Sequence, residues 1–110
     1  MAKFTAESLD GTWVIRVAGE VDMTSTDDLL ALATDCLDRG DRLRLDLGAV
    51  TFIDSSGLGI LLRIRRHAAD AGKLLTLAYV GPGTERLLKV TGLYPLFDIE
   101  PSPGETTAPR

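Results

Sequence analysis

The sequence predicts an α/β fold with a mixed, mostly parallel sheet and helices packed mainly on one face of that sheet. Apolar, strand-like runs alternate with amphipathic segments in the order β-β-α-β-α-β-α-β, and single strands separated by helices pair in parallel. The first two strands flank Asp10-Gly11, a dipeptide typical of tight hairpins, so one antiparallel pair is expected. Residues 42–47 alternate strictly, with Leu43, Leu45 and Leu47 on one side, which predicts one buried and one exposed sheet face.

The elements before this strand follow from turn residues and helix periodicity. Residues 3–9 and 12–18 form the hairpin, and Gly19-Glu20-Val21-Asp22 closes its second strand. A helix is expected at about residues 25–39, because apolar positions recur there at spacings of three and four. Its expected features are a cap from Thr24, Ser25 or Thr26, acids Asp27 and Asp28 in the first turn, and Gly40 at the end.

The later elements are predicted in the same way. Gly48-Ala49 is expected to break the strand before residues 50–53 lead into a polar corner. A helix at about residues 56–71, a strand at about 73–80 and a helix opened by Gly81-Pro82-Gly83-Thr84 follow. Residues 93–99 are expected to form a last strand, at the sheet edge because it contains Pro95. The domain spans residues 1–100, and residues 101–110, with three prolines, are expected to be a disordered tail.

Composition argues against several classes of function. A chain of 110 residues, 45% hydrophobic and 25% charged, is expected to form one globular domain. Its net charge of −4 argues against nucleic-acid binding, which needs clustered basic residues. The lone Cys36 excludes an internal disulfide, and a single histidine argues against a metal site, so no metal or other cofactor is expected. Without a signal peptide or a long apolar run, the protein is expected to be cytoplasmic, with no membrane insertion.

The stretch Asp54-Ser55-Ser56-Gly57-Leu58-Gly59 is the strongest candidate site. It leads from a predicted strand into a predicted helix whose first turn holds two glycines. A glycine inside a helix costs about 1 kcal/mol relative to alanine. Two glycines beside two hydroxyls and a carboxylate indicate a corner that another molecule approaches closely. Ser55 is the candidate functional residue at this corner.

Several chemistries use a serine between a strand and a helix. A hydrolase nucleophile needs a base, and the only histidine, His67, lies more than two turns along the same predicted helix. A phosphate-binding loop needs a glycine pattern that is absent, and Asp54 would repel phosphate. A phosphoacceptor serine is compatible with the unpaired N–H groups at a helix N-terminus. The residues alone leave open that Ser55 or Ser56 is merely the helix N-cap.

Two motifs of this sequence resemble those of bacterial anti-sigma factor antagonists, the STAS-domain proteins. The corner at residues 54–59 matches their D-S-[ST]-G-[LI]-G signature, and the strand ending in Gly19-Glu20-Val21-Asp22 matches their G-E-[LVI]-D motif. The spacing of the motifs and the order of the elements also fit, and the resemblance covers about residues 3–100. It implies a STAS-type single domain.

The resemblance implies transcription regulation, not an enzyme, so no catalytic residue is expected. In this family the unphosphorylated antagonist binds an anti-sigma factor that is also an ATP-dependent serine kinase, and this binding frees a sigma factor. The kinase phosphorylates the serine directly after the motif's Asp, and a PP2C-type phosphatase reverses the reaction. The serine in that position here is Ser55, so the chain resembles a bacterial phosphoprotein that works by partner switching. Ser56 matches the second hydroxyl, which is usually not the acceptor.

The resemblance also implies a set of kinase-contacting residues: Glu20, Asp22, Asp54, Ser56, Gly57, Leu58 and Gly59. The two glycines are expected to leave room for the partner's backbone, and Leu58 to add an apolar contact. The plain alternatives are a solvated turn at Glu20 and Asp22, a solvated helix face at Arg63 and Arg66, and a strand end and core role for Thr51 and Phe52. The motifs also leave open a second function, an unphosphorylated STAS adaptor of a transport ATPase or a signalling complex.

Overall fold

The computed structural model describes residues 2–100, so the tail expected at residues 101–110 lies outside the described part of the chain. Five strands form one sheet whose spatial order equals their order in the sequence. The elements are β1 (Ala2–Leu9), β2 (Thr12–Val21), α1 (Thr26–Arg39), β3 (Arg42–Ile53), α2 (Ser55–Asp70), β4 (Leu74–Ala78), α3 (Pro82–Val90), a 3-10 turn η1 (Tyr94–Leu96) and β5 (Asp98–Ile99).

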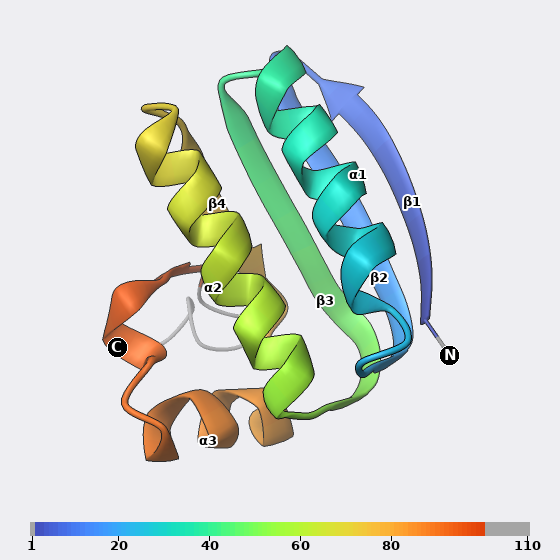
Figure 1. Cartoon of the computed structure of the whole chain (residues 1–110), viewed down its shortest axis with the longest axis vertical. Coiled ribbons are helices and arrows are strands. Elements are labelled where there is room, and N and C mark those ends of the chain that lie inside the picture. Colours follow the sequence, from blue (N-terminus) through green and yellow to red (C-terminus); the bar gives the residue numbers. More distant parts are fainter. Residues whose placement is uncertain (1, 101–110) are drawn as a thin grey trace, which may run out of the picture.

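The sheet is mixed and mostly parallel, which confirms the predicted fold class. β1 and β2 are antiparallel, and the pairs β2–β3, β3–β4 and β4–β5 are parallel. The hairpin turn holds Asp10 at φ 51° and Gly11 at φ 83°, the two positive values that a type I′ turn requires. Helices α1 and α2 lie across one face of the sheet, and α3 lies at its lower end beside the start of α2 (Figure 1).

Aliphatic side chains between the sheet and the two long helices form the core. The strands contribute alternate positions such as Ile15 and Leu45, and the helices contribute Leu37, Leu61 and Ile64, all of them at most 1% exposed. Burying one such side chain contributes roughly 1.5–3 kcal/mol. The opposite sheet face carries charged pairs, including a bidentate contact of Arg44 with Glu100 at 2.8 and 3.0 Å. The one-sided placement of the helices thus follows from the alternation in β3.

Two predicted elements are wrong in detail. Gly48-Ala49 does not end the strand, because β3 continues to Ile53 and the irregularity appears as register shifts in its pairing with β2. Residues 93–99 do not form one strand. They form the 3-10 turn and a two-residue β5, since Pro95 has no N–H to give to a sheet.

Gly40 closes α1 for a reason that the sequence pattern does not reveal. Its φ is −128°, an extended value, so no left-handed cap is formed. A Cβ at this position would lie 2.6 Å from Cδ1 of Trp13. The glycine is therefore required by the close packing of the Trp13 ring.

Candidate functional site

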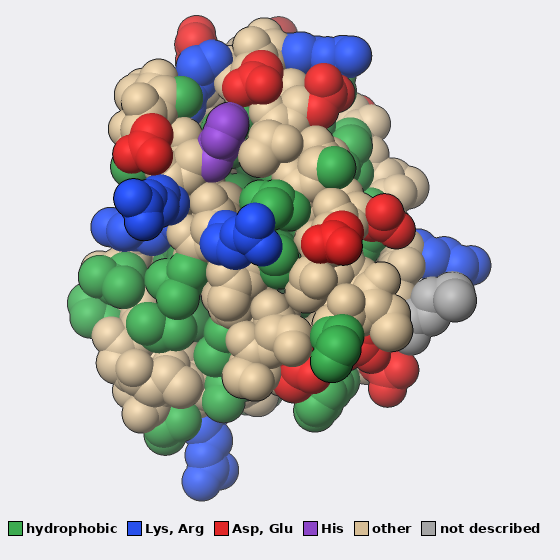
Figure 2. Space-filling model, in the orientation of Figure 1, with side chains coloured by type: hydrophobic (Ala, Val, Ile, Leu, Met, Phe, Trp, Pro, Cys, Tyr) green, Lys and Arg blue, Asp and Glu red, His purple; other side chains and the backbone are tan. Residues whose placement is uncertain are grey.

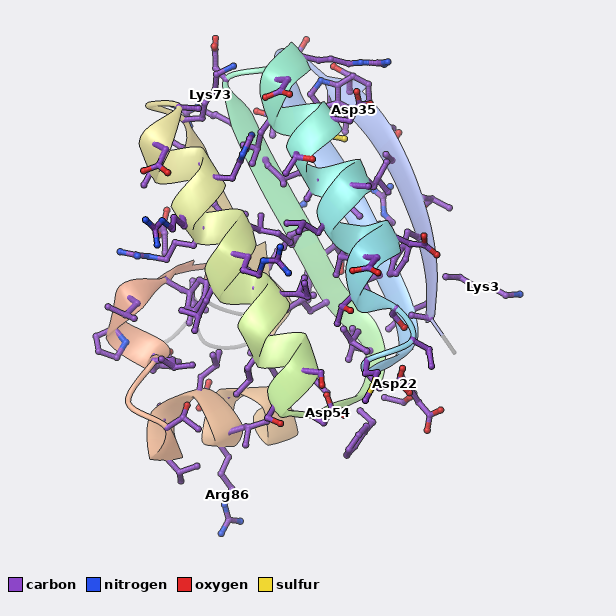
Figure 3. All side chains as sticks on the ribbon, viewed as in Figure 1. Lys3, Asp22, Asp35, Asp54, Lys73 and Arg86 are labelled. Atoms are coloured by element: carbon purple, nitrogen blue, oxygen red, sulfur yellow. The ribbon has the colours of Figure 1, made fainter. Side chains whose placement is uncertain are left out.

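The two motifs meet at one edge of the sheet. β2 and β3 are parallel neighbours, and Val21 pairs with Ile53, so the residues that follow them emerge side by side. The backbone N–H of Asp54 donates to the carbonyl of Val21 at 3.4 Å. Asp22 and Asp54 accordingly lie close together at the lower end of the sheet (Figure 3). The topology thus places an acidic loop beside the candidate serine.

Asp54, not a serine, caps helix α2. Its backbone is extended, and its Oδ1 accepts a hydrogen bond from the N–H of Gly57 at 3.1 Å. The alternative that Ser55 or Ser56 is the N-cap is therefore wrong. Ser55 is the first residue of the helix and is exposed, whereas Ser56 is half-buried. Within the described residues the Ser55 hydroxyl makes no hydrogen bond, so it is free to react or to contact a partner.

The loop after β2 fixes a charged carboxylate next to this hydroxyl. Gly19, near the end of β2 where the pairing with β3 shifts register, adopts φ 93°, a left-handed value that favours glycine. The Oδ1 of Asp22 accepts from the hydroxyl of Thr24 at 2.6 Å and from its N–H at 3.0 Å. These bonds, the hydroxyl first, lower the pKa of Asp22 below its ordinary value. The carboxylate is therefore oriented and ionised at neutral pH.

The two glycines of the corner have different surroundings. A Cβ at Gly57 would lie 2.5 Å from Cγ1 of Ile53 and 2.7 Å from the carbonyl oxygen of Val21. A Cβ at Gly59 would have no atom within 4 Å. Gly57 is thus needed for the packing of α2 on the strand ends, and only Gly59 leaves space that a partner could enter.

Leu58 and Phe52 exchange the roles expected from the sequence. Leu58 is 5% exposed and belongs to the core, so its side chain has almost no surface to offer a partner. Phe52, expected in the core, is 53% exposed because its neighbour Ile53 takes the inward position. Met23, in the loop after Asp22, is 72% exposed. Sequence reasoning missed both apolar residues, although strict alternation back from a buried Ile53 would have placed Phe52 outside.

The lower edge of the molecule therefore combines charge and apolar surface. Acidic and hydrophobic side chains lie next to each other there in the space-filling view (Figure 2). Beside them is a hollow of about 280 Å³, lined by residues 50–53 at the end of β3 and by residues 81–84 at the start of α3. These features are typical of a protein-binding surface more than of an enclosed catalytic pocket.

The structure gives the other candidate residues no part in this site. The Nε2 of His67 contacts Oδ1 of Asp38 at 3.2 Å and so links α2 to α1. It lies 12 residues beyond Ser55 in one helix, which is about 18 Å along the axis. Arg66 forms an exposed contact with Asp70. Among residues 2–100 there is no cluster of His, Cys, Asp and Glu that would hold a metal, and none of the helices is long and apolar enough to cross a bilayer.

Known proteins share both the fold and the motifs. The family model described as "Mlab, STAS domain" matches residues 4–97, and the chain belongs to this STAS-domain family. The anti-sigma F factor antagonist of Paenibacillus polymyxa is 30% identical over 82% of this chain and 81% of its own length. The crystal structure of an anti-sigma factor antagonist from Mycobacterium paratuberculosis superposes with a TM-score of 0.82 at 29% identity, covering 96% of this chain and 90% of that one.

A further solved structure shares the fold. The Bacillus cell fate determinant SpoIIAA in its phosphorylated form has a TM-score of 0.71, with 22% identity over 94% of this chain and 96% of that one. At this identity the likeness shows the shared fold only. The relatives named here are regulatory proteins, not enzymes.

Proposed function

We propose that this chain is an anti-sigma factor antagonist controlled by phosphorylation of Ser55. Its unphosphorylated form binds an anti-sigma factor that is also a serine kinase, and this binding frees a sigma factor in the cytoplasm. The kinase transfers the γ-phosphoryl group of ATP to the Ser55 hydroxyl and ends the binding, and a PP2C-type phosphatase restores it. Anti-sigma factor antagonists among the relatives support this function.

The observation that carries the proposal is the free hydroxyl of Ser55. Because Asp54 caps the helix, Ser55 is exposed at the first position of α2 and has no structural task. A hydroxyl in this position can enter a kinase active site without any unfolding of the corner. Ser56, one residue further along, is half-buried and is the poorer acceptor.

The charges around Ser55 explain how one phosphate would act as a switch. The unphosphorylated corner already presents the carboxylates of Asp22 and Asp54, so it suits a basic partner surface. A phosphate adds about −1.5 to −2 charges and considerable bulk to a surface that the partner contacts closely. A loss of about 3 kcal/mol of binding free energy lowers the affinity more than a hundredfold. Phosphorylation therefore acts directly in the interface and needs no change of fold.

Two matched serine variants test the acceptor. The purified chain is incubated with ATP and the anti-sigma factor kinase encoded in the same genome, and its mass is measured. One phosphate is expected on the wild type and on Ser56→Ala, and none on Ser55→Ala. Phosphorylation of Ser55→Ala to the wild-type extent would reject the acceptor assignment. Ser55→Asp is expected to bind the kinase more weakly than Ser55→Ala, which imitates the dephosphorylated state.

A second candidate is an unphosphorylated adaptor of a transport ATPase or a signalling complex. The description of the matching family model names Mlab and not an antagonist, and this favours considering the adaptor function as well. A pull-down with and without ATP distinguishes the two functions. The antagonist releases its partner as Ser55 becomes phosphorylated, whereas an adaptor keeps its partner and gains no phosphate.

A further inference from the structure

The hollow beside Ser55 is open surface that the fold does not need. One wall is the end of β3, residues 50–53, and the other is the start of α3, residues 81–84. Gly81 and Gly83 line it, and a Cβ on either glycine would meet no atom within 4 Å. Neither has a positive φ, so no backbone strain requires glycine at these positions. Neither packing nor backbone conformation requires these two glycines. Because they have no side chains, the hollow stays open on the α3 side.

The rim of the hollow adds an apolar side chain that the protein leaves unburied. Phe52 lines the hollow and is 53% exposed. Exposing an aromatic ring to water is unfavourable, and such rings are enriched where partners bind. Hydrophobic surface is visible at this edge directly beside the acidic side chains (Figure 2). The lining of the hollow exposes more polar than apolar surface, so the ring of Phe52 is its main apolar contact.

The charges nearby identify the chemistry of the occupant. None of the residues lining the hollow is charged. Glu20 is the neighbour of Phe52 across the β2–β3 pairing, and Asp22 and Asp54 follow the same two strands. An exposed aromatic ring beside three carboxylates is complementary to an apolar side chain that has a basic group next to it. It is not complementary to a nucleic acid or an acidic peptide.

We propose that an apolar side chain of the kinase, flanked by a basic residue, enters this hollow and packs on the Phe52 ring at its rim, and that this contact selects the kinase for which Ser55 is the substrate. The inference rests on the function proposed above. Recognition at the hollow is distinct from phosphoryl transfer at Ser55, because the hollow lies beside the acceptor and contributes nothing to the transfer. Filling or disrupting the hollow therefore weakens recognition, while phosphoryl transfer to Ser55 is unaffected.

Two opposite changes of the hollow test this inference. Gly83→Leu fills it, and Phe52→Ser removes its apolar rim. For the kinase that phosphorylates the wild type, each variant is expected to raise the KM for the chain roughly tenfold while kcat stays the same. Leu9→Ser is the matched control, because Leu9, the last residue of β1, is 52% exposed and pairs with Thr12 at the start of β2, the end of that strand away from the hollow. Its KM is expected to stay at the wild-type value.

Thermal unfolding separates recognition from folding. Gly83→Leu replaces a poor helix residue and its Cβ meets no atom within 4 Å, so its Tm is expected to equal or exceed that of the wild type. Wild-type KM values for both hollow variants would overturn the inference and leave the proposed function standing, as would an equal loss in Leu9→Ser. No phosphorylation of the wild type by any anti-sigma factor kinase of its genome would instead reject the proposed function. A wild-type KM that does not rise with salt would overturn the basic flank of the occupant.

Discussion

Gly57 and Gly59 stand two residues apart in one helix, yet their substitution should have opposite effects on stability. Gly57→Ala places a methyl group against Ile53 and the Val21 carbonyl, so it is expected to cost about 1–3 kcal/mol. Gly59→Ala meets no atom and removes the penalty of a helical glycine, so it is expected to stabilise the protein by about 1 kcal/mol. Urea unfolding followed by circular dichroism measures both changes.

The kinase assay tests whether glycine at position 59 serves recognition. A methyl group at Gly59, one turn after Ser55, occupies space that we assign to the partner, so Gly59→Ala is expected to be phosphorylated more slowly although it is more stable. A stabilised variant with wild-type phosphorylation would show that Gly59 has no part in recognition. A Gly59→Ala protein that is less stable than the wild type would contradict the packing argument itself.

Single residues of the site were predictable where chemistry marks them. Ser55, Asp22 and Asp54 carry polar groups in two motifs, and the parallel pairing of β2 and β3 brings the residues after both strands to one end of the sheet. The exchange between Leu58 and Phe52 was not predictable in the same way. Its cause is geometric, because the side that a residue faces depends on the strand register and on the residue where the helix begins. The helix begins at Ser55, one residue before the predicted start, and the β2–β3 register shifts before Phe52.

Asp54 caps helix α2 and also presents a negative charge at its start. Substitutions can separate these two roles. Asp54→Asn keeps a side-chain oxygen that accepts from the Gly57 N–H, so the stability is expected to stay within about 0.5 kcal/mol of the wild type. Asp54→Ala removes the cap and is expected to cost about 1 kcal/mol. If the charge also serves recognition, both variants are expected to bind the kinase more weakly.

Chemical denaturation and kinase binding are measured on the same protein samples. The comparison is informative because Asp54→Asn changes the charge and not the cap. Equal binding by Asp54→Asn and the wild type would show that Asp54 acts only through the helix. A large loss of stability in Asp54→Asn would mean that the carboxylate charge, and not its oxygen, holds the helix start.

The helices and strands were predictable from sequence periodicity. The errors in their bounds arise where contacts with distant parts of the chain determine the structure. α1 was expected at residues 25–39 and spans Thr26–Arg39, because its apolar stripe and flanking acids are local signals. β3 continues through Gly48-Ala49, since β2 pairs with it again at Ala49 and Val50, a long-range contact that a local pattern does not reveal. The last strand shrinks to Asp98–Ile99 because the chain before it, with Pro95, forms the 3-10 turn.

The molecule as a whole separates its stabilising contacts from its candidate site. At the end of the sheet opposite Asp22 and Asp54, Lys73 lies at the top of the view, where α2 leads into β4 (Figure 3). Its Nζ donates to the carbonyls of Leu37 at 2.7 Å and Gly40 at 2.8 Å, at the C-terminal end of α1. A cation at this position also suits the negative end of the helix dipole. One side chain thereby ties α1 to the turn before β4.

Lys73→Met tests whether this tie stabilises the fold without affecting the switch. Methionine keeps an apolar stem of similar length but leaves two carbonyls without their charged donor, so a loss of about 1–3 kcal/mol is expected. For a domain of this size, each kcal/mol lowers the Tm by about 4–8 °C. Lys3→Met is the control, because Lys3 is exposed and the change in its free energy of unfolding is expected to stay within about 0.5 kcal/mol.

Well below its Tm, Lys73→Met should be phosphorylated at Ser55 at the wild-type rate, because the site is built from the opposite ends of the strands. A slowed reaction in the folded variant would mean that a change in the position of α1 affects the acceptor corner, and that the two ends of the sheet are not independent.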